Sequence, residues 1–97
     1  MDIGINEGIN ISNLKMLEIL HNELSKLGNV GVDTKFKASL DGNISRYIHE
    51  MTGIDCFQIE INHELRFNKI NSLVEVFNNV IKLFENEIEK NEIKRII

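Results

Sequence analysis

The stretch that decides the predicted fold is Asp55–Asn62, which reads DCFQIEIN. Apolar and polar side chains alternate along it, a period of two that is typical of a β-strand. Its apolar face is formed by Phe57, Ile59 and Ile61. Its polar face is formed by Gln58, Glu60 and Asn62. A carboxylate in mid-strand has two explanations: Glu60 faces solvent at a sheet edge, or it faces a cleft in which the carboxylate is used.

The chain before this strand predicts a β-helix-β unit. Met1–Ile5 is short and apolar and predicts a strand, which starts at the first residue as if inside a larger fold. Ser12 or Asn13 is the expected N-cap of an amphipathic helix that ends at Gly28. Asn29–Asp33 predicts a second strand, parallel to the first if the helix is its crossover. The helix carries leucines at three- and four-residue steps: Leu14, Leu17, Leu20, Leu24 and Leu27.

A second helix and two loops surround the central strand. Thr34–Gly42 is predicted to be a connecting loop with Phe36 as its apolar anchor. Asn43–Thr52 predicts a short helix that Gly53 ends, and His63–Lys69 predicts a polar loop. The apolar residues of this helix predict a buried stripe: Ile44, Tyr47, Ile48 and Met51.

The last part of the chain predicts a long helix. Ser72 and Glu75 fit a capping box at its start, and an apolar face continues to about Glu89. Together the segments predict an α/β fold with a mainly parallel sheet of about three strands and three helices, in the order β-α-β-α-β-α. Residues 1–89 are expected to form a single α/β domain, and residues 90–97 a charged, isoleucine-containing tail that extends the last helix.

Composition excludes several classes of function. The chain has 97 residues, 42% of them hydrophobic and 27% charged, as in ordinary globular domains. Its net charge of −4 argues against a protein that binds the phosphate backbone of nucleic acid. The sequence contains neither an apolar run of transmembrane length nor a signal peptide, so no membrane association is expected. Cys56 is the single cysteine, which excludes an internal disulfide and favours a cytoplasmic location.

Three side chains near the central strand, Glu60, Arg46 and Arg66, are candidates for chemistry. Glu60 is the candidate general base or acid, because a carboxylate between covering helices acquires a raised pKa by desolvation. Arg46 and Arg66 could each clamp a substrate carboxylate with two hydrogen bonds, or lie in surface ion pairs. Cys56 has no His or Asp partner in the sequence pattern and is interpreted as a small buried residue.

The three histidines do not form a metal-binding pattern. His21 and His49 are expected to face solvent on their helices. His63 lies three residues after Glu60, and the two side chains share a face only if the strand ends between them. A complete zinc site within this chain is therefore not expected.

The segment FKASLDGNISRYIHEMTGIDCFQIEINHELRF, residues 36–67, resembles the C-terminal signature of N-formylglutamate amidohydrolase-like proteins. In that family a Gly-x-Ile-Ser/Thr-Arg element precedes a strand that reads Gln-x-Glu-Ile-Asn. The opening DIGINEG and the first helix of this chain are similar to the strand and helix that precede this signature in the family. The resemblance therefore covers roughly Asp2 to Phe84. QIEIN is its most specific part.

The resemblance implies a zinc-dependent amide hydrolase related in fold to the zinc carboxypeptidases. Glu60 matches the family's glutamate, Arg46 matches the arginine of the Gly-x-Ile-Ser/Thr-Arg element, and Arg66 corresponds to the arginine that follows the strand. The family's zinc ligands lie in a His-containing N-terminal half that this sequence does not include. The chain is therefore expected to be truncated or split, to hold no Zn²⁺ itself, and to be inactive alone.

A half-fold of this kind predicts particular partners. Exposed sheet edges favour a homo-oligomer such as a dimer, or a complementary N-terminal half, and a small acyl amino acid is the implied ligand. A non-catalytic binding or regulatory module on the same scaffold is the alternative, with Gln58, Glu60 and Asn62 as its polar ligand face. A third interpretation is an active enzyme whose metal site is shared between protomers through His49 or His63.

Overall fold

The computed structural model describes residues 1–34 and 44–96, and in this part of the chain a three-stranded sheet is combined with four α-helices. The strands are β1 (Asp2–Gly4), β2 (Gly31–Val32) and β3 (Gln58–Glu60), in the order β2-β1-β3. The predicted α/β class is confirmed. The predicted loop anchor, Phe36, lies outside the described residues.

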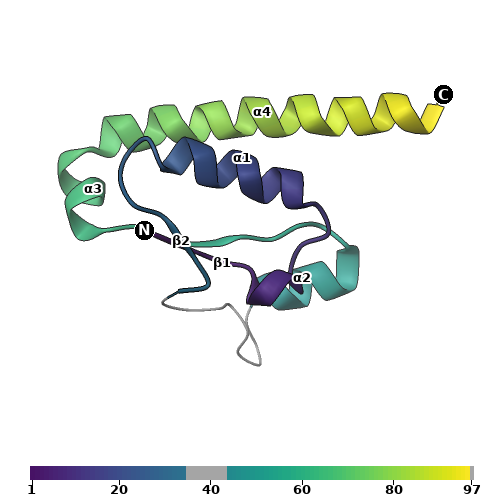
Figure 1. The fold of residues 1–97 in the computed structure, drawn as a ribbon, viewed down its shortest axis with the longest axis horizontal. Coiled ribbons are helices and arrows are strands. Elements are labelled where there is room, and N and C mark those ends of the chain that lie inside the picture. Colours follow the sequence, from purple (N-terminus) through teal and green to yellow (C-terminus); the bar gives the residue numbers. More distant parts are fainter. Residues whose placement is uncertain (35–43, 97) are drawn as a thin grey trace.

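The sheet is mixed, so the prediction of a mainly parallel sheet is wrong. β1 and β2 are parallel, as the β-helix-β pattern predicted, but β3 is antiparallel to β1. The reason lies in the chain path through α2 (Ile44–Thr52), which lies near the end of β1 rather than crossing the sheet (Figure 1). The chain therefore enters β3 beside the C-terminal end of β1, where Gln58 pairs with Gly4, and runs back antiparallel.

The first helix, α1 (Leu14–Leu24), follows the sequence prediction closely. Asn13 is its N-cap and accepts a hydrogen bond from the backbone N–H of Lys15 at 2.9 Å. A short 3₁₀ helix, η1 (Asn6–Gly8), lies between β1 and α1. α1 ends at Leu24, four residues before Gly28, where the sequence predicted its end, because the residues after Ser25 form tighter turns.

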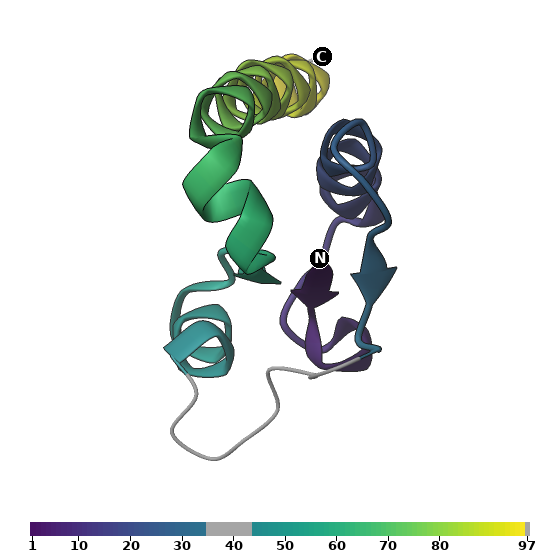
Figure 2. The ribbon, with the colours of Figure 1, turned by 90° about the vertical axis from the view of Figure 1, so that its left-hand side faces the viewer.

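The core lies between the sheet and a layer made of α1 and α4 (Ile70–Ile96), which run side by side over one face (Figures 1 and 2). The predicted capping box is wrong: α4 already begins at Ile70, and the Leu73 N–H donates to the Lys69 carbonyl. α4 continues through the predicted tail to Ile96. The buried apolar cluster draws on β1, the segment after it, α1 and α4: Ile3, Ile5, Ile11, Leu20, Leu24, Val76 and Val80.

Two elements near β3 differ from the predictions. The expected buried stripe of α2 is largely exposed, because α2 lies near one end of the sheet instead of over its face. Ile44, Tyr47 and Met51 are each more than 60% exposed, whereas Ser45 is buried. The segment expected to be a polar loop forms α3 (His63–Asn68), which buries Leu65. Among the described helices, none combines the length and the apolar character needed to cross a membrane.

Candidate functional site

The strand register gathers polar residues on the sheet face opposite α1 and α4. Asp2 of β1 is paired with Gly31 on one side and with Glu60 on the other, and Gly4 is paired with Gln58. Directly paired residues on neighbouring strands project from the same face. We call this surface the polar face and define it by Asp2, Gly31, Gln58 and Glu60.

Asp2 is held rigidly within the polar face. Its side chain is completely buried, and Oδ1 accepts hydrogen bonds from Thr34 Oγ1 at 2.6 Å and from the Thr34 N–H at 3.3 Å. Gly31 leaves the space for this arrangement. A Cβ at Gly31 would lie 2.7 Å from Asp2 Oδ1 and closer still to Thr34 Oγ1. The sequence therefore needs glycine at position 31 to accommodate the buried carboxylate.

Glu60 lies directly beside Asp2 in the register, and its own environment is different. β3 is an edge strand, and both Glu60 and Gln58 are exposed. Of the two explanations for a carboxylate in mid-strand, the structure shows the first, a side chain that faces solvent at a sheet edge. Cross-strand neighbours have Cβ atoms roughly 5 Å apart. The site is thus a pair of carboxylates, one buried and fixed, the other accessible.

The two candidate arginines lie on different elements that flank β3. Arg46 is on α2, where its Nε donates to Glu50 Oε1 at 2.9 Å in an i,i+4 ion pair. Arg66 is exposed on α3, and Figure 1 shows α2 and α3 at opposite ends of the strand that connects them. The structure therefore does not gather both arginines around one point beside Glu60.

The histidines are also separated. His21 was expected to face solvent, but it is half-buried, and its Nε2 lies 3.0 Å from the Val30 carbonyl oxygen. His49 was also expected to face solvent, but its side chain is only 13% exposed, and its Nδ1 lies 2.7 Å from the Ile54 carbonyl oxygen. The ring centroids of His63 and Phe67 lie 4.3 Å apart. In residues 1–34 and 44–90 no three His, Cys, Asp or Glu side chains are placed to share a metal ion. The described residues therefore do not fit the Zn²⁺ that the family resemblance implies.

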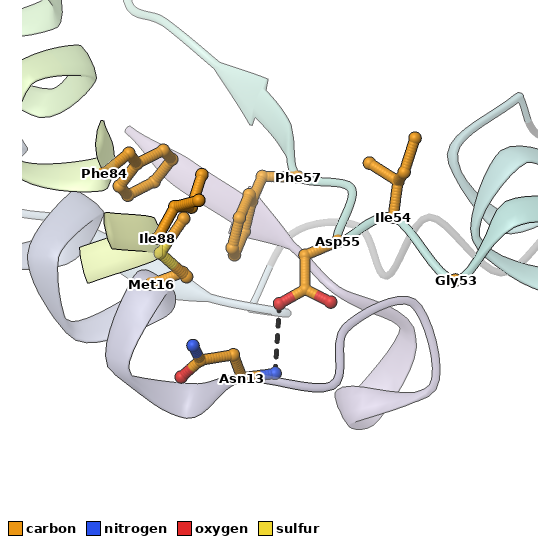
Figure 3. Close-up of a pocket in the computed structure, with 8 residues that line it drawn as sticks. All are labelled: Asn13, Met16, Gly53, Ile54, Asp55, Phe57, Phe84 and Ile88. Atoms are coloured by element: carbon orange, nitrogen blue, oxygen red, sulfur yellow. Dashed lines mark hydrogen bonds between the residues drawn. The ribbon is translucent and has the colours of Figure 1, made fainter. Parts of the chain in front are cut away.

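A separate pocket of about 510 Å³ opens between the start of α1, the segment before β3, and α4 (Figure 3). Its acidic residue is Asp55, whose two oxygens accept the backbone N–H groups of Ser12 at 2.7 Å and Asn13 at 3.0 Å. This carboxylate thereby satisfies donors at the start of α1, a role favoured by the helix dipole. The rest of the lining is mainly apolar: Met16, Ile54, Phe57, Phe84 and Ile88, with Asn13 and Gly53.

Cys56 is not set up as a nucleophile. Its Sγ lies 3.4 Å from the Ile54 carbonyl oxygen, to which the thiol can donate. Partial burial, and then the negative charge of Asp55, raise the pKa of this thiol above its usual value. A raised pKa lowers the thiolate fraction at neutral pH, and the thiolate is the reactive form.

Comparisons with family models, with curated proteins and with solved structures found no match to this chain. The site must therefore be interpreted from its own geometry. Sequence reasoning missed Asp2, although an aspartate in an otherwise apolar strand was a usable signal. It also missed the capping role of Asp55, and no local pattern could have revealed it, because the two donors lie more than forty residues earlier in the chain.

Proposed function

We propose that this chain is the carboxylate-bearing half of an amidohydrolase-like domain, related to the N-formylglutamate amidohydrolase-like family and inactive alone. The observation that carries the proposal is the register that places Glu60 of the QIEIN strand directly beside Asp2. In this proposal the exposed Glu60 carboxylate is the general base that takes a proton from water. Asp2, whose Oδ1 accepts a hydrogen bond from Thr34 Oγ1, is the second carboxyl group beside it.

The substrate of the assembled site is proposed to be a small acyl amino acid. Arg46 and Arg66 are proposed to bind its carboxylates, since a guanidinium matches carboxylate geometry with paired hydrogen bonds. For Arg46 this requires that its ion pair with Glu50 is exchanged for the substrate carboxylate. Both side chains of that ion pair are exposed, so breaking it changes the free energy by little. The two arginines flank opposite ends of β3, so each is assigned a different part of the ligand.

A second polypeptide is proposed to complete the domain. β2 and β3 are the two edges of a three-stranded sheet, and an edge strand offers backbone groups to a further strand. The described residues lack a metal-binding cluster, so catalysis in a family of zinc hydrolases requires ligands from elsewhere. A His-containing α/β half encoded beside this chain is the expected source of those ligands.

The test combines the full chain with that complementary half. The chain alone is expected to show no hydrolysis of N-formyl-L-glutamate and no stoichiometric zinc by elemental analysis. The mixture is expected to hydrolyse it, and Glu60→Gln in this chain is expected to lower the rate by about 100-fold or more, the usual contribution of a general base. The matched control is Glu64→Gln, an exposed glutamate on α3, which should leave the rate unchanged. Hydrolysis by the chain alone would contradict the proposal.

The second candidate function is a non-catalytic binding module, and the pocket beside Asp55 favours it. Its volume suits a small ligand, and its apolar lining with a few polar groups is typical of binding sites. The two candidates differ in where a ligand acts. In NMR titrations with N-formyl-L-glutamate, shifts at Gln58 and Glu60 support the hydrolase-like site. Shifts confined to Phe57, Phe84 and Ile88 support the pocket instead.

A further inference from the structure

The pocket beside Asp55 has an apolar part and a charged part, and together they indicate the chemistry of a ligand. Its apolar part is formed mainly by Met16, Phe57, Phe84 and Ile88. The ring centroids of Phe57 and Phe84 lie 6.2 Å apart. Figure 3 shows Phe57 between the other apolar side chains and the Asp55 carboxylate. A ligand in this pocket therefore places its apolar body against the rings and its polar group beside Asp55.

Asp55 is the one charged side chain among the described residues that line the pocket. Its two oxygens accept one backbone N–H each, from Ser12 and Asn13. A carboxylate has about four acceptor positions on its two oxygens, so acceptor capacity remains for a ligand. The side chain is 15% exposed, so part of the carboxylate can be reached from outside.

The cationic side chains nearest to Asp55 have other partners. His49 Nδ1 lies 4.0 Å from Asp55 Oδ1 but only 2.7 Å from the Ile54 carbonyl oxygen, which is the distance of a hydrogen bond. Lys15, at the start of α1, faces Glu18, with 3.9 Å between Nζ and Oε1. The dipole of α1 supplies only about half a positive charge, less than the full charge of a carboxylate. The polar end of the pocket therefore keeps a negative charge.

Four backbone N–H groups at the start of α1 are already paired, which disfavours an anionic ligand. Those of Ser12 and Asn13 donate to Asp55. The Lys15 N–H donates to Asn13 Oδ1 at 2.9 Å, and the Met16 N–H donates to the Asn13 carbonyl oxygen at 3.2 Å. A helix N-terminus binds anions through such N–H groups. A carboxylate or phosphate in the pocket would therefore meet the charge of Asp55 without these donors to compensate the repulsion.

We propose that the pocket binds a small primary ammonium ion with an aromatic or aliphatic body. The ammonium group donates hydrogen bonds to Asp55, and the body packs against Phe57, Phe84 and Ile88. The inference deepens the second candidate function, a binding module, and rests on it rather than on the hydrolase-like site. Because Phe57 lies next to Asp55 (Figure 3), the same ammonium group is also attracted by an aromatic ring. The net charge of −4 favours the approach of a cation from solution.

An NMR titration of the full 97-residue chain with three ligands of similar shape tests the proposal. The ligands are 2-phenylethylammonium, neutral 2-phenylethanol and anionic 3-phenylpropionate. The ammonium ion is expected to shift the amide signals of Asn13, Asp55, Phe57 and Ile88. The alcohol is expected to bind about 10-fold more weakly, the scale of one hydrogen bond to a charged group, and the anion more weakly still. Equal dissociation constants for the three ligands would overturn the preference for an ammonium ion while leaving a binding pocket. No shift at these amides with any of the three would overturn the pocket as a binding site too.

Variants separate the contribution of the charge from that of the apolar lining. Asp55→Asn removes the charge but keeps an oxygen acceptor, and it is expected to raise the dissociation constant of the ammonium ion by about 10-fold without changing that of the alcohol. Ile88→Ala is expected to weaken both ligands by about 3-fold, because it removes apolar contact area. Glu64→Gln, which removes an exposed charge on α3, is the matched control and should change neither constant.

Circular dichroism checks that each variant keeps its helices. An Asp55→Asn chain that binds the ammonium ion as tightly as the unmodified chain overturns the proposal. If Asp55→Asn does not fold, the comparison of the three ligands on the unmodified chain still decides the outcome, because it depends on no variant.

Discussion

The two faces of the sheet are buried by different means, and adjacent residues of β1 show the contrast. Ile3 and Asp2 are both completely buried, yet they project from opposite faces. Ile3 joins the apolar cluster beneath α1 and α4. Asp2 accepts hydrogen bonds from the hydroxyl and the backbone N–H of Thr34, and the absence of a side chain at Gly31 leaves room for its carboxylate.

The contrast has an energetic meaning. Burial of an apolar side chain is favourable by itself, and its partners are replaceable as long as volume is preserved. Burial of a carboxylate is unfavourable unless specific donors satisfy it. The apolar face therefore explains why the chain folds, whereas the polar face needs an additional explanation, and the carboxylate pair of the proposed site supplies one.

The largest expected effect concerns the apolar face. Ile3→Ala removes a fully buried side chain from the core and is expected to lower the free energy of unfolding by about 2–5 kcal/mol. Urea denaturation measures the change. Leu14→Ala is the matched control, since Leu14 is 71% exposed, and it should change stability by less than about 0.5 kcal/mol. Similar losses at the two positions would show that the buried cluster is assigned to the wrong face.

The next effect tests how tightly the polar face is packed. Gly31→Ala forces a Cβ against Asp2 Oδ1 and Thr34. We therefore expect the free energy of unfolding to fall by about 1–3 kcal/mol, as in other overpacked sites. Thr34→Ala removes the closest of these atoms, and in the double variant it should recover part of the loss. Thermal unfolding of the single and double variants measures both effects. A neutral Gly31→Ala would contradict the close packing of the Asp2 and Thr34 side chains against position 31.

Much of the apolar architecture could be predicted from the sequence. The leucine spacing from Leu14 onward located α1, and the short apolar segments around Ile3 and Val32 located β1 and β2. These predictions succeeded because each depends on local periodicity. The direction of β3 was wrong because it depends on where α2 lies relative to the sheet, which periodicity does not encode. For the same reason, the sharply amphipathic α2 was wrongly predicted to be buried.

The candidate site was only half predictable. The alternating pattern identified Glu60 and the face on which it lies, but it did not identify its neighbour, Asp2. That pairing depends on strand register across almost sixty residues of sequence. The environments of His21 and His49 were not predicted either, although the carbonyl oxygens beside them, of Val30 and Ile54, lie only nine and five residues further along the chain. The turn after each helix brings these carbonyl groups back to the ring, and helical periodicity does not encode that turn.

A smaller effect links the pocket to the start of α1. Asp55→Ala removes the acceptor of the Ser12 and Asn13 N–H groups. It is expected to lower the free energy of unfolding by about 1 kcal/mol, the typical value for loss of a helix cap. Asp55→Asn keeps one oxygen acceptor and should cost less. Native-state hydrogen exchange measures the effect where it arises, because these two amides should exchange faster in Asp55→Ala. Unchanged exchange at both amides would contradict the capping role.

The smallest effect decides whether the two carboxylates of the polar face act on each other. Like charges directly opposite on neighbouring strands repel, so Glu60→Gln should raise the free energy of unfolding by a few tenths of a kcal/mol (roughly 0.2–0.5) at neutral pH. The same change in the Asp2→Asn background should give no gain, because the repelling charge is already absent. The difference between the two backgrounds is the coupling energy of a double-mutant cycle, and urea denaturation of all four chains measures it. A gain that persists in the Asp2→Asn background would mean that Glu60 senses some other charge, and the pair could not be the core of the proposed site. A gain that disappears in that background shows that Asp2 carries the charge that Glu60 senses, so the buried and the exposed carboxylate share one electrostatic environment.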